Sequence, residues 1–270
     1  MTSASSWTPR GIVGGQAARR RFRLLRWPAA PALDPFVDYY WIVSWDLAGE
    51  EPYQVSVLTH PCVHLVFEPR GALIYGVVRG VFSYRLEGAG RVFGVRFRPG
   101  CFRPFLGSAV SAITDRSLGA GEIIGTDASA VARSVAAAAD EEEAAAAVDC
   151  FLSAVAPAPD PAAQAVARMV EVAAADLAIT RVDELARRLG VGTRTLQRLF
   201  AAYVGVPPKW VIRRYRLHEA AERAVLGTDV DWPGLATDLG YCDQAHLIRD
   251  FTATVGASPA RYARATANRS

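Results

Sequence analysis

Hydrophobic and polar positions follow two different periods along this chain. Between residues 35 and 106, short aromatic and β-branched runs are separated by clusters of glycine, proline and acidic residues, which is typical of strands joined by turns. The runs cover residues 39–43, 53–58, 64–67, 81–86 and 91–97. In the last two runs apolar residues alternate with polar ones, so each strand should have one apolar face. The pattern predicts an antiparallel sheet or a small barrel.

Arginine occupies polar positions at the end of the last run. Arg96 and Arg98 alternate with Val95 and Phe97. Because successive side chains of a strand point to opposite faces, we expect both arginines to face solvent or a partner surface.

From Gly119 the apolar residues recur at helical spacing. Asp127 is placed to cap a helix over residues 128–139, and Asp140 is placed to cap a second helix that ends near Ala154. Glutamates at positions 141–143 fall in the first turn of the second helix, where they interact favourably with the helix dipole. Both helices are rich in alanine, and we expect them to serve packing or dimerisation rather than chemistry.

Three prolines between residues 157 and 161 interrupt the helical pattern and predict a linker. After the linker all apolar spacing is helical. Thr180 and Asp183 resemble a capping box at the start of one of these helices. The expected helices are Arg181–Leu189, Thr193–Phe200, Pro208 to about Leu226, Trp232–Leu239 and Gln244–Thr252.

Two pairs of these short helices are each joined by a glycine-containing turn, over residues 182–200 and 232–251. Such pairs are typical of helix-turn-helix units, in which the second helix enters the major groove of duplex DNA. The outer faces of the second helices carry arginine and glutamine. These side chains suit base edges, because arginine can donate two hydrogen bonds to guanine and glutamine can pair in a similar way with adenine.

Positive charge is concentrated in the same part of the chain. The whole chain has a net charge of +3, but residues 161–270 alone hold 15 basic residues against 11 acidic ones. A cluster of positive charge indicates a polyanionic partner. Nine of the basic residues lie close together, namely Arg187, Arg188, Arg194, Arg198, Lys209, Arg213, Arg214, Arg216 and Arg223.

Residues 164–262 resemble the DNA-binding domain of the AraC/XylS family of transcription regulators. The matching stretches are DELARRLGV at 183–191, RTLQRLF at 194–200, GVP at 205–207, RLHEA at 216–220, DLGYCDQAHLIRDF at 238–251 and GASPARY at 256–262. In that family a long middle helix, here from about Pro208 to Leu226, holds two DNA-reading units about one DNA turn apart. The chain departs from the family at Gly192, where the family often has serine as the N-cap.

The resemblance implies which side chains contact DNA. In the first unit, Arg194, Gln197 and Arg198 are expected to face bases, and in the second unit Gln244, His246 and Arg249 are expected to face DNA. We expect Lys209, at the start of the long helix, to contact a phosphate. The partner predicted for this domain is double-stranded DNA.

The N-terminal region more loosely resembles the small β-rich sensor domains fused to some AraC-type regulators. The resemblance covers residues 20–125 and is carried by HPCVHLVFE at 60–68 and FGVRFRPG at 93–100. It implies a sensing or assembly role without naming an effector, and a homodimer is one expected partner. A small apolar or aromatic effector is a hypothesis that rests on the aromatic residues of this region. Eight aromatic residues could line a pocket for an effector or fill a core: Trp41, Trp45, Phe67, Tyr75, Phe82, Tyr84, Phe93 and Phe97.

The predicted fold class is α+β. An N-terminal antiparallel β-rich domain, of small-barrel or cupin-like type, is followed by helices and then by an all-α C-terminal domain with two helix-turn-helix units. The predicted domains are a β-rich sensor or assembly domain over 1–125, a helical packing or dimerisation segment over 126–156, a linker over 157–161 and an AraC-type DNA-binding domain over 162–270.

An enzyme fused to a DNA reader remains the alternative. His60, His64 and Glu68 lie four residues apart and could hold a metal on one strand, but Pro61 interrupts that strand. An alkyl-transfer enzyme would need clustered zinc-binding cysteines, which Cys62 and Cys101 do not supply. We therefore expect no catalytic residue, metal or cofactor.

The scattered cysteines and the absence of any apolar run near the roughly 20 residues of a membrane span favour a cytoplasmic protein without membrane contact. The Arg19–Arg21 cluster resembles a twin-arginine export signal, but Arg23, Arg26 and Pro28 interrupt the apolar stretch that such a signal requires.

Overall fold

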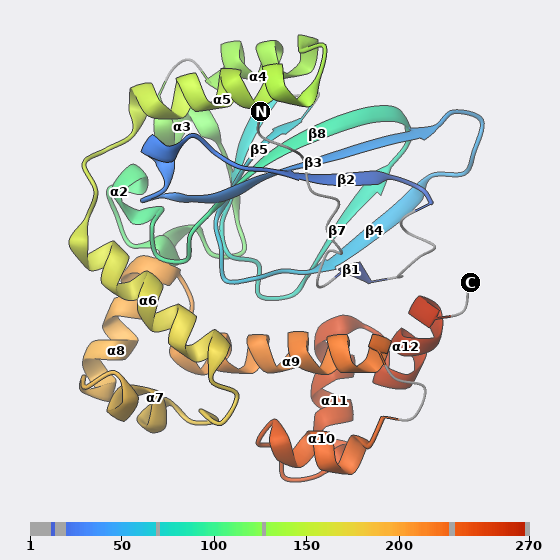
Figure 1. Ribbon diagram of the computed structural model, residues 1–270, viewed down its shortest axis with the longest axis vertical. Coiled ribbons are helices and arrows are strands. Elements are labelled where there is room, and N and C mark those ends of the chain that lie inside the picture. The colour runs from blue at the N-terminus through green and yellow to red at the C-terminus, as the bar shows by residue number, and fades with distance from the viewer. Residues whose placement is uncertain (1–11, 14–19, 69–70, 126–127, 227–229, 268–270) are drawn as a thin grey trace.

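The computed structural model describes residues 12–13, 20–68, 71–125, 128–226 and 230–267 (Figure 1). Two antiparallel sheets make up the first half of the chain. One sheet has six strands in the order β2-β3-β8-β5-β6-β9, and the other has three in the order β1-β4-β7. The strands are β1 Ile12–Val13, β2 Arg23–Trp27, β3 Val37–Leu47, β4 Tyr53–Leu58, β5 His64–Glu68, β6 Gly71–Tyr75, β7 Val81–Leu86, β8 Gly88–Phe97 and β9 Ser117–Gly119.

All five strands expected from the short aromatic and β-branched runs are present, and the α+β fold class is confirmed. The longest of them, β3 and β8, pair antiparallel from Tyr39 opposite Arg96 to Leu47 opposite Gly88, and the register shifts between Val37 and Tyr39. β8 also pairs with β5, so it lies at the centre of the larger sheet. The sequence pattern missed β2 and β6, which pair with β3 and β5.

The expectation that Arg96 faces solvent or a partner is wrong. Its side chain is only 12% exposed and lies beside Asp38, with 3.3 Å between Arg96 Nε and Asp38 Oδ2. Both faces of β8 are covered, because the three-stranded sheet lies over the face that carries Arg96. Arg98, just beyond the end of β8, donates from Nε to the carbonyl of Asp34 at 2.8 Å.

Short helices cover the other face of the larger sheet (Figure 1). They are η1 Pro31–Leu33, α2 Arg103–Leu106, η2 Val110–Ile113, α3 Ala120–Ile124, α4 Ala128–Ala137 and α5 Glu141–Val155. Asp140 caps α5 as expected, since its side chain accepts a hydrogen bond from the backbone N–H of Glu143. The proposed cap Asp127 lies outside the described residues.

The C-terminal part is helical throughout its described residues, and its first helix begins at Pro161. The linker therefore ends at Asp160, whose side chain caps α6. The expected capping box of Thr180 with Asp183 is not formed, because the N-cap is one residue later and has no side-chain cap hydrogen bond. Arg181 is the N-cap of α7, and the Glu184 carboxylate accepts from the backbone N–H of Arg181 at 2.9 Å. The elements are α6 Pro161–Ala175, α7 Val182–Arg188, α8 Thr193–Leu199, the π-helical turn η3 Phe200–Val204, α9 Pro208–Leu226, α10 Trp232–Asp238, α11 Gln244–Val255 and α12 Pro259–Ala267.

The hydrophobic core continues from the sheets into the helical part. A single cluster of buried side chains includes Ile42 and Phe93 of the large sheet, Val148 of α5, and Val166 and Leu196 of the C-terminal helices. Among the described residues, no helix combines the length and the apolar character needed to cross a bilayer.

Gly94 in β8 lies opposite Trp41 of β3, and the indole ring of Trp41 covers it. A methyl group at this position would occupy the space of that ring. We expect Gly94→Ala to lower the free energy of unfolding by about 1–3 kcal/mol, because extra volume in a packed interior forces side chains to move. Chemical denaturation measures the change.

Gly121→Ala is the matched control, because nothing lies near the added methyl group and the residue is in α3. It should leave stability unchanged or raise it by up to about 1 kcal/mol, as alanine favours helices over glycine. Equal stabilities for the two variants would contradict the packing of Trp41 on Gly94.

Candidate nucleic-acid interface and interior cavity

Two helix-turn-helix pairs are present, α7 with α8 and α10 with α11. Each turn contains a glycine in the left-handed region, Gly190 at φ 66° and Gly240 at φ 71°. Other residues adopt this conformation at a cost, so glycine favours these tight turns. The apolar residues Leu185, Leu196 and Leu247 on the inner faces of these helices are fully buried.

The helix α9 separates the two pairs (Figure 1). Its 19 residues correspond to roughly 28 Å at 1.5 Å per residue. This length is close to the roughly 34 Å that separates successive major grooves on one face of DNA. The first pair belongs to the main core, whereas the second packs around a separate cluster that includes Leu217 of α9.

The residues predicted to contact DNA lie mostly on exposed surface. Arg194, Gln197 and Arg198 are exposed on α8, and Lys209 is exposed in the first turn of α9. The helix α8 begins at Thr193 with Gly192 as N-cap, without a side-chain cap.

On α11, His246 and Arg249 are exposed and Gln244 is half-buried in the first turn. The His246 ring meets the ring of Tyr241 edge to face, with 5.2 Å between ring centroids. This contact orients the imidazole without covering it.

The nine clustered basic residues have different environments. Arg214 and Arg216 are 2% and 4% exposed and belong to the interior, so interpreting all nine as one surface charge was wrong. Arg213 and Arg223 are exposed but form ion pairs with Asp250 and Glu219. Within the described part of the chain, the exposed members with no ion pair are Arg187, Arg188, Arg194, Arg198 and Lys209.

Sequence reasoning missed the role of Asp250. This aspartate is 8% exposed on α11 and accepts from Arg213 Nε of α9 at 2.7 Å and from the Tyr241 hydroxyl at 2.8 Å. The three side chains fix α11 on α9. The signal was available, because Asp250 is three residues after Leu247 and therefore lies on the apolar face of α11.

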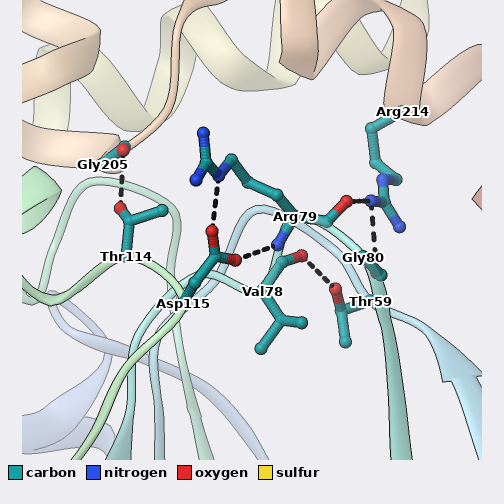
Figure 2. A network of polar contacts seen from close by, with 8 residues as sticks. All are labelled: Thr59, Val78, Arg79, Gly80, Thr114, Asp115, Gly205 and Arg214. Carbon is teal, nitrogen blue, oxygen red and sulfur yellow. Dashed lines mark hydrogen bonds and ion pairs between the residues drawn. The ribbon is translucent and has the colours of Figure 1, made fainter.

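Figure 2 shows where the helical part meets the sheets. From α9, Arg214 Nη2 donates to the carbonyl of Arg79 at 2.5 Å. From the η2 region, Thr114 Oγ1 donates to the carbonyl of Gly205 at 2.7 Å. Asp115 holds the Arg79 backbone, accepting from its N–H at 2.7 Å. The two halves of the chain are therefore joined by hydrogen bonds as well as by a common core.

A cavity of about 210 Å³ lies between the two sheets. Five of the eight aromatic residues expected to line a pocket do so: Trp41, Trp45, Tyr75, Phe82 and Tyr84. The other three, Phe67, Phe93 and Phe97, are buried in the main core. Polar groups are few but include His60, His64 and Arg96.

The histidines of the metal alternative have other partners. His64 Nδ1 accepts from Trp41 Nε1 at 3.1 Å, and Glu68 accepts from the Tyr75 hydroxyl at 2.7 Å. In the described residues, no group of three or more histidine, cysteine or carboxylate side chains is arranged to hold a metal ion.

Comparison with known proteins identifies two regions. Residues 25–119 match a domain of unknown function (DUF6597), and residues 185–265 match a helix-turn-helix domain. No curated protein matches the sequence.

Similar solved structures include ToxT from Vibrio cholerae O395, with 11% identity and a TM-score of 0.43 over 96% of this chain and 98% of that chain. They also include unsaturated fatty acid-bound wild-type ToxT from V. cholerae strain SCE256, with 10% identity and a TM-score of 0.41 over 96% and 95% of the respective chains.

Burial, and secondarily the nearby Arg96 guanidinium, lowers the pKa of His64 to about 3. The unfolded chain has a histidine pKa of about 6.5, so it binds a proton that the folded state rejects. Stability is therefore full above about pH 6.5 and decreases as the pH falls, by about 2 kcal/mol at pH 5 for this one group. Urea denaturation at pH 7 and pH 5 measures the loss.

His64→Gln keeps an acceptor for Trp41 but cannot titrate. The decrease in its free energy of unfolding between pH 7 and pH 5 should therefore be smaller than that of the parent protein. His246→Gln, at an exposed position, is the control and should retain the parent loss. Identical losses in the parent and in His64→Gln would contradict the assignment of a neutral, buried His64.

Proposed function

We propose that this chain is a transcription regulator that binds specific sequences of duplex DNA, because residues 185–265 match a helix-turn-helix domain. In this proposal α8 and α11 enter successive major grooves on one face of the duplex. The observation that carries it is the pair of exposed second helices joined through α9 (Figure 1), whose length of roughly 28 Å approaches the roughly 34 Å of one DNA turn.

The exposed side chains supply the required chemistry. Arg194, Gln197 and Arg198 read bases in one groove, and His246 and Arg249 face DNA in the next, with Gln244 at the start of α11. Arginine forms two hydrogen bonds with guanine and glutamine forms two with adenine. Lys209 neutralises a phosphate, which contributes affinity without sequence preference.

The N-terminal sheets, within the predicted domain 1–125, bind a small apolar or aromatic effector. The cavity supports this proposal over a role in assembly alone, because a fully packed sheet interior would leave no room for a ligand. Its lining is mainly apolar with a few polar groups, which is usual for ligand sites. Pairing of two copies through the helices of residues 126–156 stays a prediction.

Arg198→Ala and Arg249→Ala should each weaken binding to the specific site by about 1–3 kcal/mol, if each loses a two-bond contact with a base. Both should narrow the difference in affinity between specific and random duplex. Lys209→Ala should weaken binding to both duplexes by a similar factor, since it removes a phosphate contact. The site is first located by footprinting the upstream intergenic region, and fluorescence anisotropy then measures both affinities.

Arg133→Ala is the control. Arg133 is exposed on α4, which lies at the end of the molecule away from α8 and α11 (Figure 1). This variant should bind both duplexes like the parent. Full discrimination between specific and random DNA in both recognition-helix variants would contradict the assigned roles of α8 and α11.

Indole or naphthalene should raise the melting temperature of the full chain. A cavity of about 210 Å³ is larger than the roughly 150 Å³ cavity that binds benzene in another protein. The free energy of unfolding should increase with ligand concentration, by about 2.7 kcal/mol when that concentration is a hundred times the dissociation constant. Differential scanning fluorimetry over a concentration series measures the shift.

Val55→Phe replaces an isopropyl group in the cavity lining with a larger aromatic ring, which occupies part of the cavity. The melting shift should be lost in this variant. A shift of the same size in parent and variant would mean that the compounds bind elsewhere.

A further inference from the structure

One wall of the cavity is made by two segments, one at the end of β4 and just beyond it and the other just after β6. Leu58, Thr59 and His60 line the cavity from the first segment, and Gly76 and Val78 line it from the second. The segments are joined to each other, because Thr59 Oγ1 donates to the carbonyl of Val78 at 2.9 Å (Figure 2). The wall is therefore one connected unit.

The outer side of this wall is the surface on which α9 lies. Leu58 packs into the apolar cluster that contains Leu217 of α9. The rings of His60 and His218 are stacked, with 4.0 Å between centroids and 1° between planes. His218 Nε2 also lies 3.3 Å from the carbonyl oxygen of Thr59, within hydrogen-bond distance. No intervening layer separates the cavity lining from α9 at these positions.

Arg214 of α9 also contacts the chain next to this wall. Its guanidinium is buried, and the described residues provide no carboxylate for it. It donates to the carbonyls of Arg79 and Gly80 and lies 4.4 Å from the ring centre of Trp210 (Figure 2). A buried charge that loses its partners is strongly destabilising. The 79–80 turn and α9 therefore cannot move independently without a large cost.

The neighbours of Arg214 extend this connection to both DNA-reading units. Arg213, one residue earlier, pairs with Asp250 of α11. Arg216, two residues later, donates to the carbonyls of Leu177 and Ile179, just before α7. One turn of α9 thus contacts the cavity wall and both helix-turn-helix units.

We propose that this wall is the element through which occupancy of the cavity changes DNA binding, with the His60–His218 stack and the Arg214 hydrogen bonds as the coupling contacts. The proposal rests on the proposed function and adds the route of regulation. A ligand in the cavity contacts residues 58–60 and 76–78 from within. Any shift of these residues is passed to α9, which sets the relative position of α8 and α11. By thermodynamic linkage, DNA must change ligand affinity by the same factor.

The experiment measures the ratio of operator affinities of the full chain with and without saturating indole or naphthalene, whichever gives the melting shift. We expect a ratio that differs from one by about fivefold or more, the lower end of typical coupling. In Arg214→Met and in His218→Phe the probe should still raise the melting temperature, but the ratio should approach one. His218→Phe keeps a ring that can stack on His60 and loses the polar contact with Thr59, so it should retain more coupling than Arg214→Met.

Arg223→Met is the matched control, because Arg223 is an exposed arginine on the same helix and pairs with Glu219 and with Asp238 of α10 rather than with the cavity wall. It should keep the parent ratio. Unchanged ratios in both coupling variants would overturn the proposed route. A parent ratio of one, with intact DNA binding and a clear melting shift, would overturn the regulation while leaving the proposed function standing.

Val55→Phe tests the coupling without any ligand. Filling the cavity from within should change operator affinity, and adding Arg214→Met should remove most of that change. If neither compound shifts the melting temperature, the effector proposal fails, yet this pair of variants still decides the coupling. Parent affinity in Val55→Phe, with the fold retained, would overturn it.

Discussion

A guanidinium buried without a carboxylate beside it constrains the arrangement of the whole molecule. Arg214 is held by backbone carbonyls of the β6–β7 connection, which belong to a different part of the chain from α9. Burial lowers the pKa of its guanidinium to about 10, yet the group remains charged at neutral pH. Keeping that charge satisfied requires the sheets and the helices to stay in one relative position. The shared apolar core and the bond from Thr114 to Gly205 reinforce the same position.

Local signals in the sequence were enough to find most of the elements. Short aromatic and β-branched runs identified five strands, and residues such as Asp140, Gly190 and Gly240 marked helix starts and turns correctly. These signals work because each depends on a few neighbouring residues. The three-stranded sheet and its placement over β8 depend on pairings between distant segments, which periodicity does not record. For this reason Arg96 was expected at the surface, although it lies between two sheets.

The difference between local and long-range information also explains why buried and exposed arginines were not told apart from the sequence. Counting charge identified a basic region but did not separate side chains that face solvent from those that hold the fold. Helical spacing contained part of the answer, because Arg214 is three residues from both Val211 and Leu217, which are buried. Arg194 and Arg198, by contrast, occupy the outer face of a short helix whose inner face carries Leu196. The position of each arginine relative to the apolar face of its helix was therefore more informative than the total number of basic residues.

The linker between the two parts of the chain contributes little to holding them together. Ala158 and Pro159 are exposed, and a protease could reach the chain there. A single cut at this point would leave the common core, the stacked histidines and the Arg214 hydrogen bonds in place. The two fragments would be expected to remain associated and to migrate as one particle on a sizing column, separating only under denaturing conditions. The linker thus connects the two parts covalently, whereas the common core and the Arg214 hydrogen bonds hold them together in space.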